Sequence, residues 1–186
     1  MQRSFACQLR RATVGSNCET GDIEALPRGR KSGVVGDAAA VRAAAVTLLA
    51  RRDYATAELR AKLESSGYQP DAVSQALSEL IHERLIDDAR FIENYIAQHA
   101  ERGEGPVRIA ADLEARQLDG VLTDAALAGQ DWSARARAVR QRKFGPELPE
   151  SWAKKARQAR FLQYRGFSSD HIRSALGPDF DPDAPA

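Results

Sequence analysis

Cysteine is almost absent from this 186-residue sequence, which contains only Cys7 and Cys18. The two thiols could pair or bind a metal, but a metal site needs more ligands at closer spacing, and His82, His99 and His171 are scattered. No apolar run approaches the roughly 20 residues that a membrane-spanning helix needs. The N-terminus also lacks the apolar stretch of a secretory signal. We therefore expect free thiols, no metal or other cofactor, no membrane contact and a cytoplasmic protein.

Aromatic residues are also few, at 6% of the chain, and valine and isoleucine do not alternate with polar residues, so strands are poorly supported. Alanine, leucine, arginine, glutamate and glutamine are abundant, and these are good helix formers. Residues 1–37 contain scattered glycines and no periodicity, which predicts a flexible N-terminal arm. From Ala38 onward the pattern predicts an all-α fold.

The first helical unit is delimited by local signals. Helix formers from Ala38 onward are followed by Thr56, which we expect to cap a second helix. Gly67 stands where a left-handed residue ends that helix, and Pro70 fits the first turn of a third. The result is a three-helix unit of about fifty residues.

The unit recurs along the chain. A shift of 50 places Leu63 on Leu113 and Leu77 on Leu127, and a shift of 99 places Gly67 and Tyr68 on Gly166 and Phe167. Gly103, Gly105 and Pro106 mark a stop and restart in the second unit, and Gly177 with Pro178 closes the last helix. We expect an elongated array of three three-helix modules, at 38–86, 87–130 and 131–177, with an acidic tail at 178–186. Equivalent buried leucines are expected at Leu63, Leu77, Leu113, Leu127, Leu162 and Leu176.

Catalytic signatures are missing. The sequence contains no phosphate-binding loop, no G-x-S-x-G elbow and no H-E-x-x-H pair. Asp87 and Asp88 form the one adjacent carboxylate pair that invites a catalytic interpretation, since paired acids can hold a metal or share a proton. We favour a structural role, in which Asp87 caps a helix and Asp88 lies in its first turn. We therefore expect that the protein is not an enzyme.

Charge is segregated although the net charge is only +1. Acids outnumber bases nine to four in residues 87–130, whereas bases outnumber acids eleven to four in residues 131–176. Because the acids that would pair with these bases are missing, we expect the third module to bind a partner or DNA phosphates. The candidate residues are Arg135, Arg137, Arg140, Arg142, Lys143, Lys154, Lys155, Arg157 and Arg160.

Two tryptophans, Trp132 and Trp152, flank this basic region and could stack on bases. Such residues more often anchor the core of a small module, which is the role that we favour. The bases are expected on the first two helices of the module, which suits phosphate neutralisation or an acidic protein groove better than base readout.

The chain resembles the RecX family over about residues 40–176. The resemblance rests on LARRDYA (49–55) followed by EL and KL, on LIDDARF (85–91), on GP with RI (105–109), and on RFL with RGF (160–167). The family's first-repeat signature usually has serine where Ala55 stands. Residues 1–37 are not covered.

This resemblance implies a cytoplasmic bacterial regulator that binds RecA, lodges along the RecA–DNA filament, and usually inhibits strand exchange and ATP hydrolysis. The family implies no catalytic residues. We expect a monomer that binds the RecA filament, and single- or double-stranded DNA through phosphates. Two alternatives remain at this point: a general DNA-binding helical protein without sequence specificity, and a helical scaffold for another protein.

Overall fold

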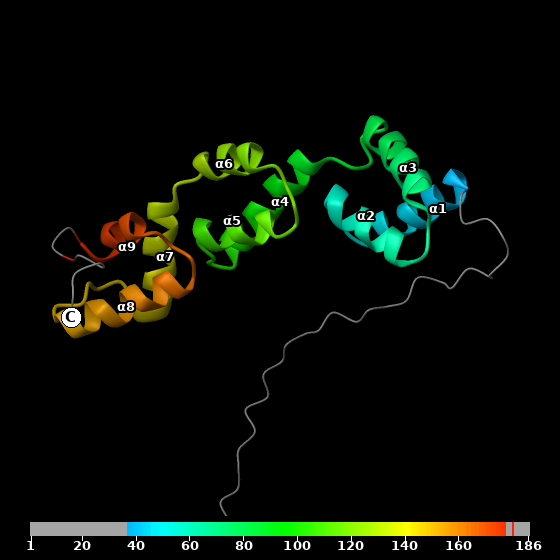
Figure 1. Cartoon of the computed structure of the whole chain (residues 1–186). Helices are drawn as coiled ribbons and strands as arrows, with labels where there is room; N and C mark the ends of the chain where they lie inside the picture. The colour runs from blue at the N-terminus through cyan, green and yellow to red at the C-terminus, as the bar shows by residue number, and fades with distance from the viewer. Residues whose placement is uncertain (1–36, 178–179, 181–186) are drawn as a thin grey trace, which may run out of the picture. The chain divides into compact units, whose positions relative to one another are not determined.

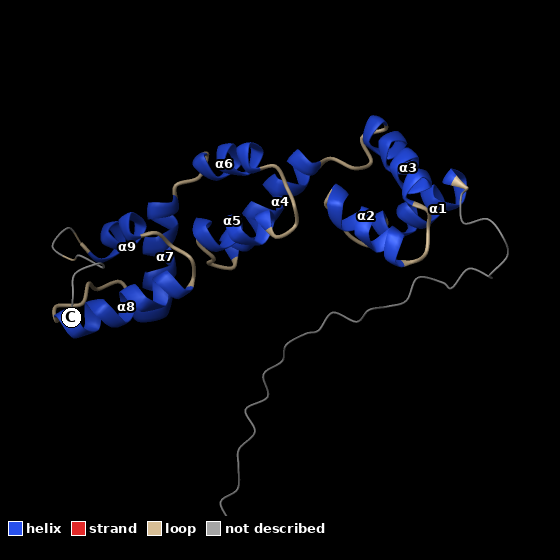
Figure 2. Ribbon diagram, in the orientation of Figure 1, coloured by secondary structure: helices blue, strands red, loops and turns tan. Residues whose placement is uncertain are grey.

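The computed structural model describes residues 37–177 and 180. Within these residues the chain forms nine α-helices and no strand (Figure 2). The predicted all-α class is therefore confirmed. Both cysteines, nearly all of the predicted arm and most of the predicted acidic tail lie outside the described residues.

The helices follow one another in three trios (Figure 1). The first trio contains α1 (Ala38–Leu49), α2 (Thr56–Ser65) and α3 (Pro70–His82). The second contains α4 (Asp88–Glu101), α5 (Pro106–Glu114) and α6 (Gly120–Ala128). The third contains α7 (Trp132–Phe144), α8 (Trp152–Tyr164) and α9 (Ser169–Leu176). The extensive helix–helix contacts all fall within a trio, with α1 on α3, α4 on α6 and α7 on α9.

The repeated leucines are buried as predicted. Leu63, Leu113 and Leu162 are fully inaccessible to solvent, and Leu77, Leu127 and Leu176 are at most 8% exposed. One buried apolar cluster runs through the second and third trios, and Ala55 joins it from the first. Phe180, at the start of the predicted acidic tail, belongs to the same cluster. Burial of these side chains supplies the main driving force for folding.

Local signals set most helix ends. Asp87 accepts a hydrogen bond from the Arg90 amide (3.1 Å) and caps α4, as predicted. Gly67 follows α2 with a φ of +94°, the left-handed conformation that favours glycine. The prediction for Thr56 was wrong, because the N-cap of α2 is Ala55 and Thr56 is the first helical residue.

The cap of α2 comes instead from the second trio. The backbone amide of Thr56 donates to Asp88 Oδ1 at 2.9 Å. Arg116 Nη1, just after the end of α5, also lies 3.4 Å from Glu58 Oε2 of α2. The carboxylate that was expected only in the first turn of α4 therefore also closes the start of a neighbouring helix.

The second and third trios meet backbone to backbone. The amide of Gly105 donates to the carbonyl of Arg165 (2.8 Å), and that of Val107 donates to the carbonyl of Gly166 (3.0 Å). These bonds place free amides at the start of α5 against free carbonyls at the end of α8, so each helix end satisfies the other. A Cβ on Gly105 would lie 2.4 Å from the carbonyl of Gly166, so glycine is required there.

Candidate functional site

The candidate basic residues lie on α7 and α8, and neither helix contains an acidic residue. Each helix begins after a residue whose side chain caps it. Asp131 caps α7 by accepting from the Ala134 amide (2.8 Å), and Ser151 caps α8 by accepting from the Lys154 amide (3.4 Å). Each capping side chain lies just before its helix, so the helical surfaces remain purely cationic.

Arg140 was predicted to belong to the binding surface, but the structure places it in the interior. Its side chain is only 2% exposed. One guanidinium nitrogen donates to the carbonyl of Glu147 (2.8 Å) and another to the carbonyl of Pro146 (3.0 Å). Arg140 follows buried Ala136 by one helical turn, so it faces the interior and holds the α7–α8 loop. It is not available to a partner.

Three further candidates make contacts within the described chain. Arg135 donates to the side chain of Gln130 (2.9 Å) and Arg137 donates to the hydroxyl of Ser174 (2.6 Å). Arg142 lies against the α4–α5 turn, with Nη2 2.9 Å from where a Cβ on Gly103 would stand. These three side chains remain charged, but each already contacts another part of the described chain.

The remaining five candidates form the open part of the site. Lys143, Lys154, Arg157 and Arg160 are exposed, and Lys155 is half-buried. Over residues 37–177 and 180, none of these five side chains makes a hydrogen bond or ion pair. We call Lys154, Arg157 and Arg160, together with the solvent-facing side of α8, the α8 face. It can neutralise phosphates or carboxylates without first breaking an internal contact.

The two tryptophans behave differently. Trp132 is buried, and its indole N–H donates to the carbonyl of Leu127 (2.8 Å), which confirms the predicted core role. For Trp152 that prediction was wrong, because this side chain is 51% exposed at the start of α8. No local signal separates the two, since each is the first residue of its helix.

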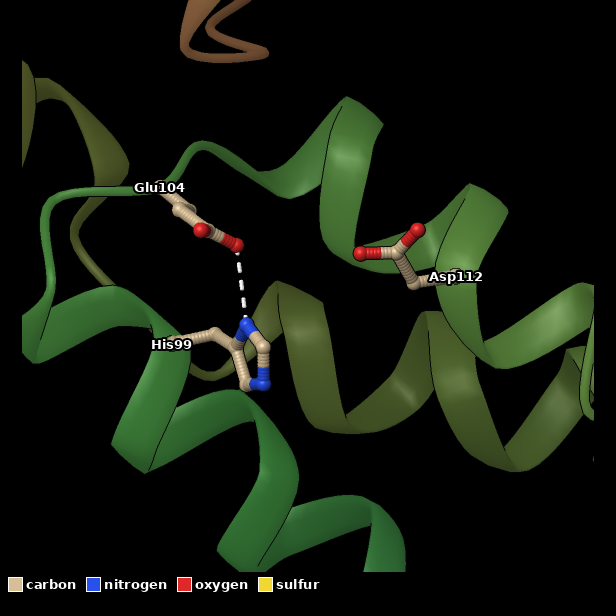
Figure 3. Close-up of side chains that lie close together, drawn as sticks. All are labelled: His99, Glu104 and Asp112. Carbon is tan, nitrogen blue, oxygen red and sulfur yellow. Dashed lines mark hydrogen bonds and ion pairs between the residues drawn. The ribbon is translucent and has the colours of Figure 1, made fainter. Parts of the chain in front are cut away.

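The second trio contains a half-buried cluster that the linear sequence did not indicate. His99, Glu104 and Asp112 place potential metal-ligating atoms within 4.8 Å of one another (Figure 3). His99 Nδ1 lies 2.8 Å from Glu104 Oε2, and the Tyr95 ring stacks on the imidazole at 3.9 Å between centroids. Tyr95, His99, Glu104 and Asp112 come from α4, the following turn and α5, so only folding brings them together.

Two arginine side chains supply positive charge near this cluster. Arg108 Nε lies 3.8 Å from Glu104 Oε2, and the Arg116 guanidinium lies 5.2 Å from the centre of the Tyr95 ring. Burial raises the pKa of Tyr95, and the nearby Asp112 carboxylate acts in the same direction. We therefore interpret the cluster as structural. The contact between His99, near the end of α4, and Glu104, in the following turn, stabilises the α4–α5 turn.

None of the described helices is both long enough and apolar enough to cross a membrane.

Three family models match consecutive parts of the chain. They describe the first, second and third three-helix domains of RecX and match residues 42–80, 87–127 and 130–176. Together these ranges include nearly all of the described residues.

Whole proteins give the same result. The Regulatory protein RecX of Halorhodospira halophila is 46% identical over 141 residues, which cover 73% of this chain and 86% of that protein. The Regulatory protein RecX of Pseudomonas fluorescens is 40% identical over 145 residues, which cover 76% and 94%. The crystal structure of RecX from Lactobacillus salivarius superposes with a TM-score of 0.66 at 22% identity, covering 75% of this chain and 94% of that one. The chain belongs to the RecX family.

Proposed function

We propose that this chain regulates the RecA recombinase by binding the RecA–DNA filament in the cytoplasm, and that it lowers ATP hydrolysis and strand exchange without catalysing a reaction. Its relatives are named Regulatory protein RecX, which supports a regulatory role. The observation that carries the proposal is the α8 face, whose cations make no ion pair or hydrogen bond with the described residues and have no acidic neighbour on their helix.

The α8 face suits a polyanion. Lys154, Arg157 and Arg160 are exposed within about two turns of one helix, so their charges act together on one strand of phosphates. The binding of such cations to DNA releases condensed counterions, which makes the affinity depend strongly on salt. Contacts of this kind position a protein on DNA without reading its sequence.

The second trio supports contact with protein. Six of its nine acids are exposed, namely Asp87, Glu93, Glu101, Glu114, Asp119 and Asp124. Such a surface repels DNA and attracts basic patches. A chain that has an acidic trio beside a basic one fits a filament made of both protein and DNA, and the acidic trio keeps DNA binding from being indiscriminate.

Charge reversal of the α8 face tests this proposal. We expect the triple variant Lys154→Glu, Arg157→Glu, Arg160→Glu to inhibit RecA-dependent ATP hydrolysis on single-stranded DNA about tenfold less at low salt. The slope of log affinity for DNA against log salt concentration should be shallower by about two, because roughly 0.7 counterions are released per phosphate contact. The fold should survive, since exposed charges contribute little to stability. Circular dichroism checks this.

A matched control reverses three exposed bases of the first two trios, Arg84, Arg90 and Arg102. It changes the net charge equally and should retain more inhibition than the α8 variant. Equal inhibition by the α8 variant and the parent would show that this face is only solvated. Salt-sensitive binding to naked DNA, with no effect on RecA, would instead support a general DNA-binding protein.

A further inference from the structure

Exposed aromatic side chains are confined to one helix of the described chain. Trp152 and Tyr164 are 51% and 81% exposed, whereas every other phenylalanine, tyrosine and tryptophan in residues 37–177 and 180 is buried or half-buried. Both exposed rings lie on α8, which also bears Lys154, Arg157 and Arg160. Large apolar rings on a surface lose the benefit of burial, so their restriction to the cationic helix requires a reason.

Helical spacing places one ring among the cations. Arg157, Arg160 and Tyr164 follow one another at intervals of three and four residues, which puts them on one side of α8. The opposite side packs into the trio through Ala159 and Leu162. In the described chain, the Tyr164 side chain makes no hydrogen bond and no ring contact, and its high exposure leaves the ring accessible.

Trp152 carries the second exposed ring at the start of the same helix, about a third of a turn around the helix axis from Tyr164. Twelve residues separate Trp152 from Tyr164, which corresponds to about 18 Å along the helix axis. Several nucleotides of an extended strand span that distance. Aromatic rings at intervals along a cationic surface are the usual means by which proteins hold single-stranded nucleic acid, because every base has a face on which a ring can stack.

We propose that α8 is a single-strand-binding surface on which Arg157 and Arg160 bind phosphates while Tyr164 stacks on an unpaired base and Trp152 on a second. This inference rests on the proposed nucleic-acid contact and specifies its substrate class. A duplex offers the same phosphates, but its base faces are already stacked on one another. The cations alone give no preference for the single strand, since the duplex has the higher charge density, whereas the exposed rings favour the single strand.

An abasic oligonucleotide separates the two contributions, because it keeps the phosphates of a single strand and lacks the bases. Fluorescence anisotropy with the full chain measures affinity for labelled oligo(dT), for an abasic strand of equal length and for a duplex. We expect oligo(dT) to bind about tenfold more tightly than the abasic strand, within the range measured for base–aromatic stacking.

Variants at Tyr164 assign the effect to the ring. Tyr164→Ala should clearly reduce the difference between oligo(dT) and the abasic strand, whereas Tyr164→Phe keeps the ring and should preserve it. Gln163→Ala changes an adjacent exposed side chain of α8 and should leave all affinities unchanged. Because Tyr164 is exposed, these variants should fold like the parent, which circular dichroism verifies.

Equal affinity of the parent for oligo(dT) and the abasic strand would overturn this inference and leave the proposed phosphate contact intact. A preference for the duplex over oligo(dT), or full retention of the preference in Tyr164→Ala, would also overturn the stacking role. Failure to bind any of the three oligonucleotides would overturn the proposed nucleic-acid contact itself, and the inference with it.

Discussion

Arg140 illustrates at the scale of a single residue how a charge can serve the fold. It is the one buried charged side chain among the described residues, and it donates to two carbonyls of the α7–α8 loop. We expect Arg140→Ala to lower the free energy of unfolding by about 2–4 kcal/mol, because both carbonyls lose a charged donor. Urea denaturation measures this. The exposed control Lys143→Ala should change stability by less than about 0.5 kcal/mol. Similar small effects for both variants would contradict the structural role of Arg140.

His171 gives the third trio a dependence on pH. Its Nδ1 lies 2.8 Å from the Ser168 hydroxyl in the capping box of α9. Burial lowers the pKa of His171, and Asp170 and Asp131 oppose this shift. The folded state therefore favours neutral imidazole, and this contribution to stability is complete above the usual pKa of about 6.5 and lost as pH falls through the lower folded value.

We accordingly expect the melting temperature of the parent to fall between about pH 7 and pH 5 by more than that of His171→Gln, whose side chain does not titrate. Melting curves at several pH values measure the difference between the two proteins. His82→Gln, at an exposed position, should behave like the parent. An identical pH profile for His171→Gln and the parent would refute this account of His171.

The division of the basic residues could be predicted only in part. Ala136, Val139 and Arg140 follow the three- and four-residue spacing of a buried helical face, so the interior position of Arg140 was detectable from periodicity. The partners of Arg137 and Arg142 were not, because Ser174 and Gly103 lie far away in sequence. Exposure of Trp152 likewise depends on how α8 packs against its trio.

At the scale of elements, the contact between the α4–α5 turn and the end of α8 depends on one glycine. Gly105 has a φ of −93°, which any residue adopts, so its requirement for glycine is purely steric. We expect Gly105→Ala to destabilise the protein by about 1–3 kcal/mol or more, because the added methyl group meets backbone that cannot move aside freely. Thermal or urea unfolding measures the loss.

Gly120 provides a matched control on α6. A Cβ there would meet nothing within 4 Å, so Gly120→Ala should be neutral or stabilise the protein by up to about 1 kcal/mol. If Gly105→Ala were equally harmless, the backbone contact between the second and third trios would not hold in solution.

Helix boundaries were largely predictable because caps, prolines and left-handed glycines act within a few residues. Asp87, Gly67 and Pro70 all have their predicted roles. The contacts between trios were not predictable in this way. Asp88 accepts a hydrogen bond from Thr56, which lies 32 residues away in sequence. Such a contact depends on how neighbouring trios pack, and a repeat pattern alone does not predict that packing.

At the scale of the whole molecule, the chain separates its charges by trio and repeats one helical design three times. The repeat explains why each trio buries equivalent leucines, and the charge pattern distinguishes surfaces that share that design. Family membership adds a regulatory role to this physical description. On α8 the repeated fold leaves cations and two aromatic rings exposed to solvent.

Titration of the full chain into RecA that is hydrolysing ATP on single-stranded DNA tests the central claim most directly. The proposed regulation predicts that the hydrolysis rate falls as the chain is added, reaches a plateau, and falls less at higher salt, because charged contacts are screened and counterion release is weakened. A hydrolysis rate that stays unchanged at saturating concentrations of the chain, in low as well as in moderate salt, would contradict the proposal.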